Sequence, residues 1–144
     1  MDNSEILLHQ LFQTARIISK GLNHCLEPYG LYSSEWSIIT TLEKTGPMTQ
    51  GALASYLNIE PPAVSRNLVK LEKKGLITRT AGMDKREKTV CLSAAALKQY
   101  SKWLEISGLH RQAILSGLTE DNRKELTGLL KTVYQSAHQY ETSR

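Results

Sequence analysis

Three consecutive segments decide the fold: TQGALASYLN (49–58), IEPPAVSRNLVKLEKKG (59–75) and LITRTAGMDKREKTVCL (76–92). The first reads as a short helix that Thr49 caps and that ends in a turn at Asn58. Proline is favoured at the first position of a helix, so Pro61 begins a second helix, and Gly75 ends it. These segments therefore predict two short helices joined by a tight turn over 49–74.

The third segment has the composition of a β-hairpin. Residues 76–80 and 88–92 are rich in β-branched side chains, and a polar, glycine-containing tip separates them. That pattern predicts two strands joined by a longer loop. The stretch as a whole therefore predicts a helix-turn-helix over 49–74 followed by a wing over 76–92.

Helical periodicity continues on both sides of this stretch. From Ser4 to Glu27, apolar residues recur at intervals of three and four, and Pro28-Tyr29-Gly30 then ends that helix. Serine or threonine caps predict three further helices, at Ser33 or Ser34, at Ser93 and at Thr119. We expect a mainly α fold with a small β wing, a single domain over 1–144 in which 33–93 form the winged helix-turn-helix.

The outer helices, over 1–30 and 94–144, carry broad apolar faces. The middle of the chain already forms a compact module with its own core. We therefore expect the outer helices to bury their apolar faces against a second copy and to act as dimerisation helices. The alternative is that they pack on one another in a monomer.

Positive charge is concentrated in one part of the chain. Residues 65 to 88 include eight basic and three acidic side chains, a local charge of +5, whereas the whole chain of 144 residues carries a formal +4. A local cluster favours a docking face for a polyanion, although a solvated helix face is the simpler explanation. The basic residues are Arg66, Lys70, Lys73, Lys74, Arg79, Lys85, Arg86 and Lys88.

The central stretch has the parts that DNA binding requires. The major groove admits an α-helix, and phosphates flank it on both sides. Small groups at the start of the second short helix can approach a thymine methyl, while Arg66 or Asn67 can make directed hydrogen bonds to bases. Thr49 and Gln50 can meet phosphates, and Lys74 adds charge beside Lys70 and Lys73. An arginine at the wing tip, Arg86, can enter a narrow minor groove.

The order of these residues resembles the MarR family of bacterial transcription regulators over nearly the whole chain. The resemblance lies in 31–39, Leu53-Ala54, Val64-Ser65-Arg66, 71–77 and the wing motif Asp84-Lys85-Arg86 with Val90, Leu92 and Ser93. The family typically has arginine in place of Lys85 and threonine in place of Ser93. Glu60 and Pro62 stand where many members carry small hydroxylated residues, which leaves the target DNA sequence open.

The resemblance implies a homodimeric, sequence-specific regulator of double-stranded DNA, most often a repressor, that reads a short palindrome. It also implies that Asp84 braces the wing while Arg86 reaches the minor groove, and that a small, often aromatic or phenolic, acid releases the protein from DNA. The predicted ligand crevice is lined by Leu22, Leu26, Tyr29, Trp36 and Trp103, although aromatic residues at helical spacing are more often core. The predicted DNA-binding residues are Thr49, Gln50, Pro61, Pro62, Ala63, Ser65, Arg66, Asn67, Lys70, Lys73, Asp84, Lys85 and Arg86.

Other functions are less well supported by the sequence. Cys25 or Cys91 could sense oxidants, but two ordinary cysteines are the simpler explanation. No pair of histidines has helical zinc-ligand spacing, so no metal or other cofactor is expected. The sequence has no glycine-rich phosphate loop and no nucleophile elbow, so it does not predict an enzyme. A helical dimer that binds proteins without touching DNA is the alternative from another class. No signal peptide or membrane span is recognisable, which predicts a cytoplasmic protein.

Overall fold

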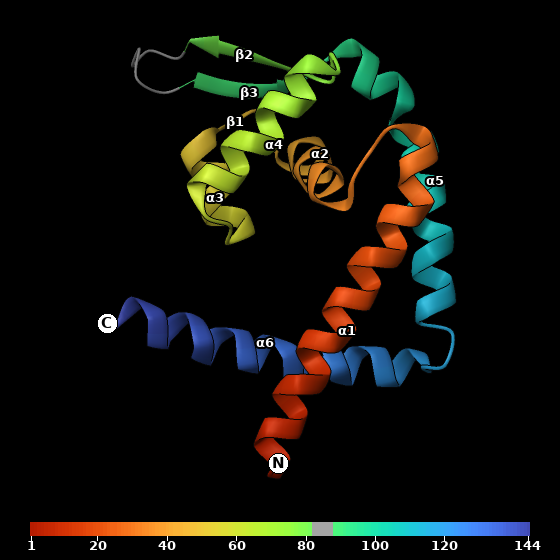
Figure 1. Cartoon of the computed structure of the whole chain (residues 1–144), viewed down its shortest axis with the longest axis vertical. Helices are drawn as coiled ribbons and strands as arrows, with labels where there is room; N and C mark the ends of the chain where they lie inside the picture. The colour runs from red at the N-terminus through yellow and green to blue at the C-terminus, as the bar shows by residue number, and fades with distance from the viewer. Residues whose placement is uncertain (82–87) are drawn as a thin grey trace. The chain divides into compact units, whose positions relative to one another are not determined.

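The computed structural model describes residues 1–81 and 88–144 (Figure 1). It divides into two compact units, Met1–His110 and Arg111–Arg144. The predicted architecture, mainly helical with a small β-sheet, is confirmed. The elements are α1 (Asn3–Leu26), the 3-10 helix η1 (Glu27–Tyr29), α2 (Ser33–Thr45), β1 (Met48–Thr49), α3 (Gln50–Leu57), α4 (Pro61–Lys73), β2 (Ile77–Ala81), β3 (Lys88–Leu92), α5 (Ala94–Ile114) and α6 (Glu120–Thr142).

The predicted helix caps at Thr49 and Thr119 are present. Thr49 accepts a hydrogen bond from the Ala52 N–H (3.1 Å), and Thr119 accepts one from Asn122 (3.1 Å). Each cap satisfies one of the backbone donors that a helix leaves free in its first turn. At the start of α2 the prediction was less accurate, because Tyr32 is the cap residue and Glu35 accepts its N–H (2.9 Å).

The core of the first unit is formed where α2, α3, α4 and the sheet meet the end of α1 and the start of α5. The fully buried side chains include Leu26, Ile39, Leu68, Val90 and Trp103. They come from five different elements, so the core joins the helix-turn-helix to the outer helices of the same unit. The complete set of buried apolar residues in the described chain is Leu26, Leu31, Trp36, Ile38, Ile39, Leu42, Leu53, Ala54, Val64, Leu68, Leu71, Leu76, Ile77, Val90, Ala96 and Trp103.

The sheet has one more strand than the sequence pattern predicts. The strand order is β1-β3-β2, with both pairings antiparallel. Met48 pairs with Val90 and Ile77 with Leu92, so β3 is the central strand. A two-residue strand has no recognisable alternation, and β1 exists only because the hairpin lies beside it.

Ser93 joins the wing to α5. Its hydroxyl accepts the Ala96 N–H (3.2 Å), as expected of a helix cap, and also donates to the carbonyl of Gly75 (2.7 Å). Gly75 has a φ of +73°, a conformation that glycine adopts without strain. The residue that begins α5 is therefore also bonded to the turn that ends α4.

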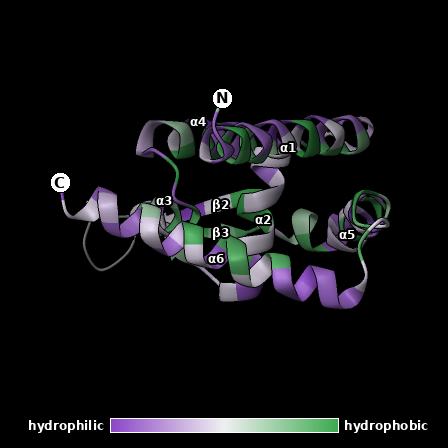
Figure 2. Cartoon of the chain, turned by 90° about the horizontal axis from the view of Figure 1, so that it is seen from below, coloured by the Kyte–Doolittle hydropathy of each residue, from purple (hydrophilic) through white to green (hydrophobic). Residues whose placement is uncertain are grey.

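Large parts of the outer helices remain exposed within one chain. On α1, Ile6, Leu7, Leu8, Phe12 and Ile17 are about half exposed or more, and no residue of α6 is buried. Figure 2 shows hydrophobic bands along each of these helices. On α5, Trp103 is inside, but Leu97, Leu104 and Leu109 are exposed. No helix of the described residues is long and apolar enough to span a membrane.

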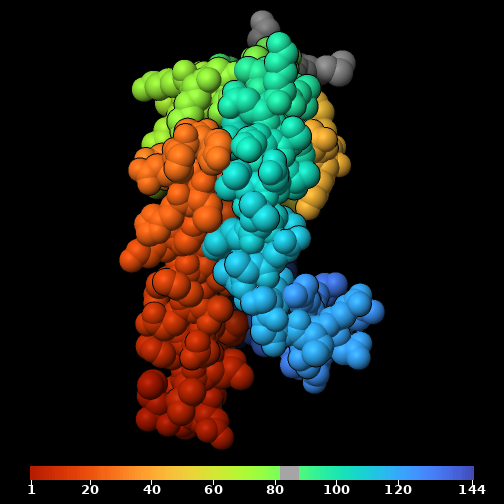
Figure 3. Space-filling view, turned by 90° about the vertical axis from the view of Figure 1, so that its right-hand side faces the viewer, coloured from red at the N-terminus to blue at the C-terminus, as the bar shows by residue number. Residues whose placement is uncertain are grey.

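The second half of α1 packs alongside α5. Figure 3 shows the two helices side by side on the face of the first unit that it presents. At Gly21 an added Cβ would come within 2.8 Å of His110 Nε2, so a side chain at this position would force the histidine to move. The glycine thus leaves room for the His110 imidazole beside α1.

Candidate nucleic-acid interface

The helix-turn-helix is held by a turn with a specific backbone conformation. Asn58 ends α3 with φ 57° and ψ 45°, in the left-handed region that asparagine tolerates better than most residues. Its N–H donates to the carbonyl of Ser55 (3.3 Å), and the Ile59 N–H donates to that of Ala54 (3.0 Å). These bonds fix the direction in which the chain leaves α3 and so place α4 against it.

One face of α4 is core and another is exposed and basic. Val64, Leu68 and Leu71 are completely buried. Arg66, Lys70 and Lys73 are exposed. They are separated by four and three residues, as the buried residues are, so they lie on a common face of the helix. This basic face of α4 consists of Arg66, Lys70 and Lys73.

The predicted DNA-binding residues differ in accessibility. Pro61 and Pro62 are exposed at the first two positions of α4, and Ala63 and Ser65 are half-buried behind them. Thr49 and Gln50 are half-buried at the start of α3. The structure thus brings the helical members of the set to two adjacent helices, while Asp84, Lys85 and Arg86 lie outside the described residues.

Asn67 has a partner within the protein. The Ser34 hydroxyl on α2 donates to Asn67 Oδ1 (3.2 Å), and the Asn67 side chain is half-buried. This bond makes the Asn67 carbonyl oxygen a link between α2 and α4. Base contact by Asn67 or Arg66 stays a prediction.

The expectation that Lys74 adds charge to the DNA-binding helix is wrong. Its Nζ atom lies 2.7 and 2.9 Å from the two carboxylate oxygens of Glu35, and it also donates to the Gly30 carbonyl (3.0 Å). The Lys74 ammonium lies 5.2 Å from the centre of the Tyr32 ring. Lys74 therefore ties the end of α4 to α2 and to the segment that follows α1.

Glu35 is a residue that the sequence analysis missed. Its side chain is completely buried, and a buried carboxylate needs a cation and hydrogen bonds to offset the loss of hydration. A signal was present: the acid stands beside Trp36 in an apolar stripe, three residues after the cap position. Tyrosine is not a usual cap residue, so neither the capping bond to Tyr32 nor the cation that pairs with Glu35 could be read from the sequence.

The wing is also attached to α4. Arg79 on β2 lies with its Nε atom 3.2 Å from a carboxylate oxygen of Glu72. The arginine side chain is largely buried, whereas the glutamate is half exposed. Arg79 was counted as a basic residue of the central stretch, and in the structure it orients β2 against the helix.

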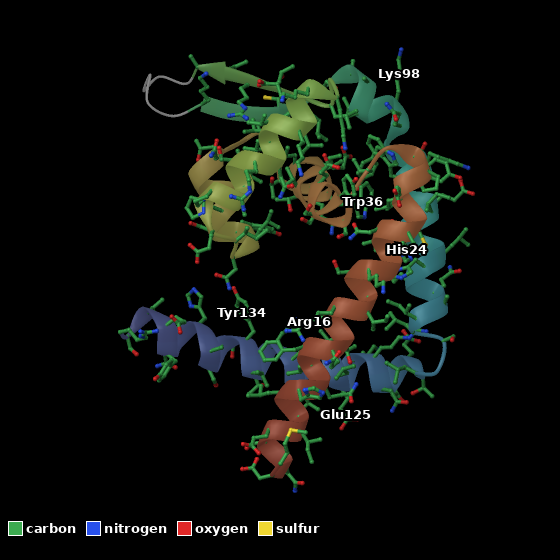
Figure 4. All side chains as sticks on the ribbon, in the orientation of Figure 1. Arg16, His24, Trp36, Lys98, Glu125 and Tyr134 are labelled. Atoms are coloured by element: carbon green, nitrogen blue, oxygen red, sulfur yellow. The ribbon has the colours of Figure 1, made fainter. Side chains whose placement is uncertain are left out.

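The five residues predicted to line a ligand crevice lie close together, mostly as packed core. Leu26, Trp36 and Trp103 are buried, Leu22 packs against the core, and Tyr29 is exposed. The Trp103 indole donates to the Tyr29 carbonyl (3.4 Å), and the Trp36 and Trp103 rings meet edge to face at 6.3 Å. Figure 4 shows Trp36 on the side of α2 that faces α1 and α5.

Tyr100 completes this aromatic cluster. Its ring lies 5.4 Å from that of Trp36. Burial raises the pKa of the Tyr100 phenol, and the carboxylate of Glu43 raises it further. The phenol is therefore neutral at physiological pH and can act as a hydrogen-bond donor beside the two tryptophans.

Neither the cysteines nor the histidines form a recognisable site. Cys25 and Cys91 are both free and half-buried, on α1 and β3 respectively. Within residues 1–81 and 88–144, no three His, Cys, Asp or Glu side chains gather as metal ligands would. Oxidant sensing by Cys25 or Cys91 remains a prediction.

Comparison with known proteins places this arrangement among transcription regulators. Residues 31–88 match the model of the MarR family. An uncharacterized HTH-type transcriptional regulator of Bacillus subtilis (strain 168), YwoH, is 40% identical over 130 residues, which are 90% of this chain and 94% of the relative.

Solved structures share the fold. The organohalide-sensing regulator RdhR-CbdbA1625 in its 2,4-dichlorophenol-bound form is 25% identical with a TM-score of 0.87, over 94% of this chain and 82% of that one. Mutant MarR from E. coli complexed with operator DNA is 25% identical with a TM-score of 0.82, over 91% of this chain and 96% of that one.

Proposed function

Because the chain belongs to the MarR family of DNA-binding transcription regulators, we propose that it is a repressor that binds a short palindromic DNA site as a homodimer. α4 enters the major groove, α3 contacts the flanking phosphates, and the wing lies along the neighbouring minor groove. Two-fold symmetry places the two copies of α4 about 34 Å apart, one turn of DNA.

The basic face of α4 is the observation that carries this proposal. Arg66, Lys70 and Lys73 are exposed, while Val64, Leu68 and Leu71 anchor the opposite side of the same helix in the core. A helix held in this way presents fixed cations to the two phosphate rows that border the groove. A protein-binding module would not need this charge, so salt dependence separates the two functions.

Replacing Arg66 with alanine is expected to cost about 1–3 kcal/mol of binding free energy at the cognate site, since one directed contact to a base is lost. The cognate duplex is obtained by selection from a random pool, and affinities are measured by titration at several salt concentrations. Wild-type affinity should fall steeply as salt rises, because phosphate contacts release counterions.

The matched control for Arg66→Ala is Arg16→Ala. Arg16 lies on α1, away from α4 in Figure 4, and is exposed. Its loss should leave the affinity nearly unchanged when sedimentation shows that the variant has the same oligomeric state as wild type. An affinity of the Arg66 variant equal to that of wild type would remove Arg66 from the interface, and binding without salt dependence would contradict the DNA-binding mode proposed for α4.

The dimer is proposed from the exposed apolar faces of the outer helices. Residues 1–30 and 94–144 serve as dimerisation helices, and the half-exposed side chains of α6 include Leu126, Leu129, Leu130, Val133 and Tyr134. Apolar surface of this extent on a soluble chain usually marks a protein interface. A second copy also supplies the second α4 that a palindrome requires.

Sedimentation of the whole chain at micromolar concentration is expected to give twice the mass of one chain. Leu129→Glu should shift the equilibrium toward the monomer, because it places a charge in an interface that excludes water. Lys131→Glu is the matched control, since it also introduces an acid on α6 but at a position that is already charged. A wild-type protein that sediments as a monomer would contradict the proposed dimer.

We also propose that a small aromatic or phenolic ligand weakens DNA binding. The site would be the aromatic region formed by Leu22, Leu26, Tyr29, Trp36 and Trp103, which lies within the same unit as the helix-turn-helix. Aromatic rings favour contacts with other aromatic rings, as the Trp36–Trp103 and Trp36–Tyr100 pairs show, and the Tyr100 phenol is a hydrogen-bond donor beside them. The 2,4-dichlorophenol of the organohalide-sensing relative supports this class of ligand.

A further inference from the structure

The first four residues of α4, Pro61 to Val64, have no free backbone donor. The first turn of a helix ordinarily presents unpaired N–H groups, which can bind phosphates or the acceptor atoms of bases. Pro61 and Pro62 have no N–H. The next two N–H groups, of Ala63 and Val64, both donate to the carbonyl of Glu60, at 3.0 and 3.2 Å. The leading turn of the helix is therefore without donors.

The side chains of the same turn present hydrocarbon. Pro61 and Pro62 are exposed, and Ala63 is half-buried behind them. The nearest polar side chain, Glu60, is exposed and makes no capping bond to the helix. A carboxylate is repelled by phosphates, so this end of α4 is suited to base edges and unsuited to the DNA backbone.

Within α4, side-chain hydrogen-bond donors begin only in the second turn. Arg66 is exposed, and Ser65 is half-buried beside it, whereas Asn67 is bonded to Ser34 on α2. The helix thus has an apolar front and a polar, basic second turn. These two parts would meet different base pairs when α4 lies in the major groove.

From this division we infer that Pro61 and Pro62 select base pairs by contact with a C5-methyl group. In the major groove thymine carries this methyl group, and cytosine carries it only when methylated. The contact is apolar and needs no donor, which matches the front of α4. The inference rests on the proposed DNA-binding function and adds to it the chemical feature that the protein recognises.

The test uses the whole protein and duplexes in which single thymines are replaced by deoxyuridine. A sequence enriched from a random pool is the parent duplex. Removal of one contacted methyl is expected to weaken binding about four-fold, the equivalent of one buried methylene. Thymines outside the protected region serve as internal controls and should show no change.

Protein variants separate methyl recognition from general affinity. In the double variant Pro61→Ser/Pro62→Ser, backbone donors and hydroxyls replace hydrocarbon. Its affinities for the duplexes with thymine and with uracil at the contacted position should therefore be almost equal. Lys73→Ala should weaken binding to both duplexes and retain the full difference between them. Circular dichroism of each variant verifies that the helices remain folded.

Two results would overturn the inference while leaving DNA recognition intact. One is equal affinity for thymine and uracil at every position of the enriched sequence. The other is an undiminished difference in the double serine variant. If the pool yields no enriched sequence, sequence-selective binding itself fails, and methyl recognition fails with it.

Discussion

Replacing Lys74 with methionine is expected to lower the free energy of unfolding by about 3 kcal/mol, because it leaves a buried carboxylate without its cation. Glu35 is completely buried, and the methionine stem cannot replace the two short contacts from Lys74 Nζ, at 2.7 and 2.9 Å. One third of the Lys74 side chain is exposed, so water can reach the site and the loss falls at the lower end of the range for buried pairs.

Urea denaturation at one protein concentration measures this loss. The double variant Glu35→Gln/Lys74→Met should recover most of it, since neutral glutamine can still accept the Tyr32 N–H. Lys73→Met is the matched control: the preceding residue, Lys73, is exposed on the basic face of α4, so its substitution should change stability by less than about 0.5 kcal/mol. Equal stabilities of the Lys73 and Lys74 variants would mean that the ion pair does not hold α4.

In DNA binding the order of the two variants should be reversed: Lys73→Met should have the larger effect and Lys74→Met the smaller one. Lys73 belongs to the basic face of α4, whereas the Lys74 ammonium is occupied by Glu35 and the Gly30 carbonyl. Under conditions in which both proteins are folded, Lys73→Met should reduce the salt dependence of binding by about one counterion. Lys74→Met should leave that dependence unchanged.

Trp103→Ala is expected to lower the free energy of unfolding by about 3–5 kcal/mol, the cost of removing a large aromatic side chain from a core. Trp103 is 1% exposed, meets the Trp36 ring edge to face, and donates its indole N–H to the Tyr29 carbonyl. The substitution therefore removes apolar contacts to α2 together with one partly buried hydrogen bond to the segment after α1.

The cavity left by this substitution offers a second measurement. Added indole should bind where the side chain was and restore about 1.4 kcal/mol at ten times its dissociation constant. Glu105→Ala is the control, because this exposed residue two positions further along α5 forms only a surface ion pair with Lys102 at 3.8 Å. Near-wild-type stability of Trp103→Ala would show that the aromatic cluster does not join α5 to the core.

Much of the fold could be predicted because its signals are local. The Thr49 cap, the turn at Asn58, the proline that begins α4 and the glycine that ends it each act within a few residues. The wing strands were likewise recognisable from composition. Caps, turns and helix breakers affect the backbone independently of residues that are distant in the sequence, so they can be recognised from the sequence alone.

The site was less predictable because its contacts cross the chain. Glu35 and Lys74 are 39 residues apart, and Ser34 and Asn67 are 33 apart. The strand β1 has two residues and exists only through its pairing with β3. No periodicity indicates such contacts, since they depend on how helices that are already formed pack against one another.

Caps, helix breakers and apolar spacing act locally, so they were enough to predict a short helix and a basic recognition helix followed by a wing. The tertiary structure decided which charges of the recognition helix are available to DNA. Lys73 and Lys74 are neighbours with the same chemistry, yet Lys73 lies on the basic face of α4, while Lys74 holds Glu35 at the junction of α2 and α4. With about 3.6 residues per turn, adjacent side chains point in different directions, and only the packed neighbours decide which direction leads to DNA.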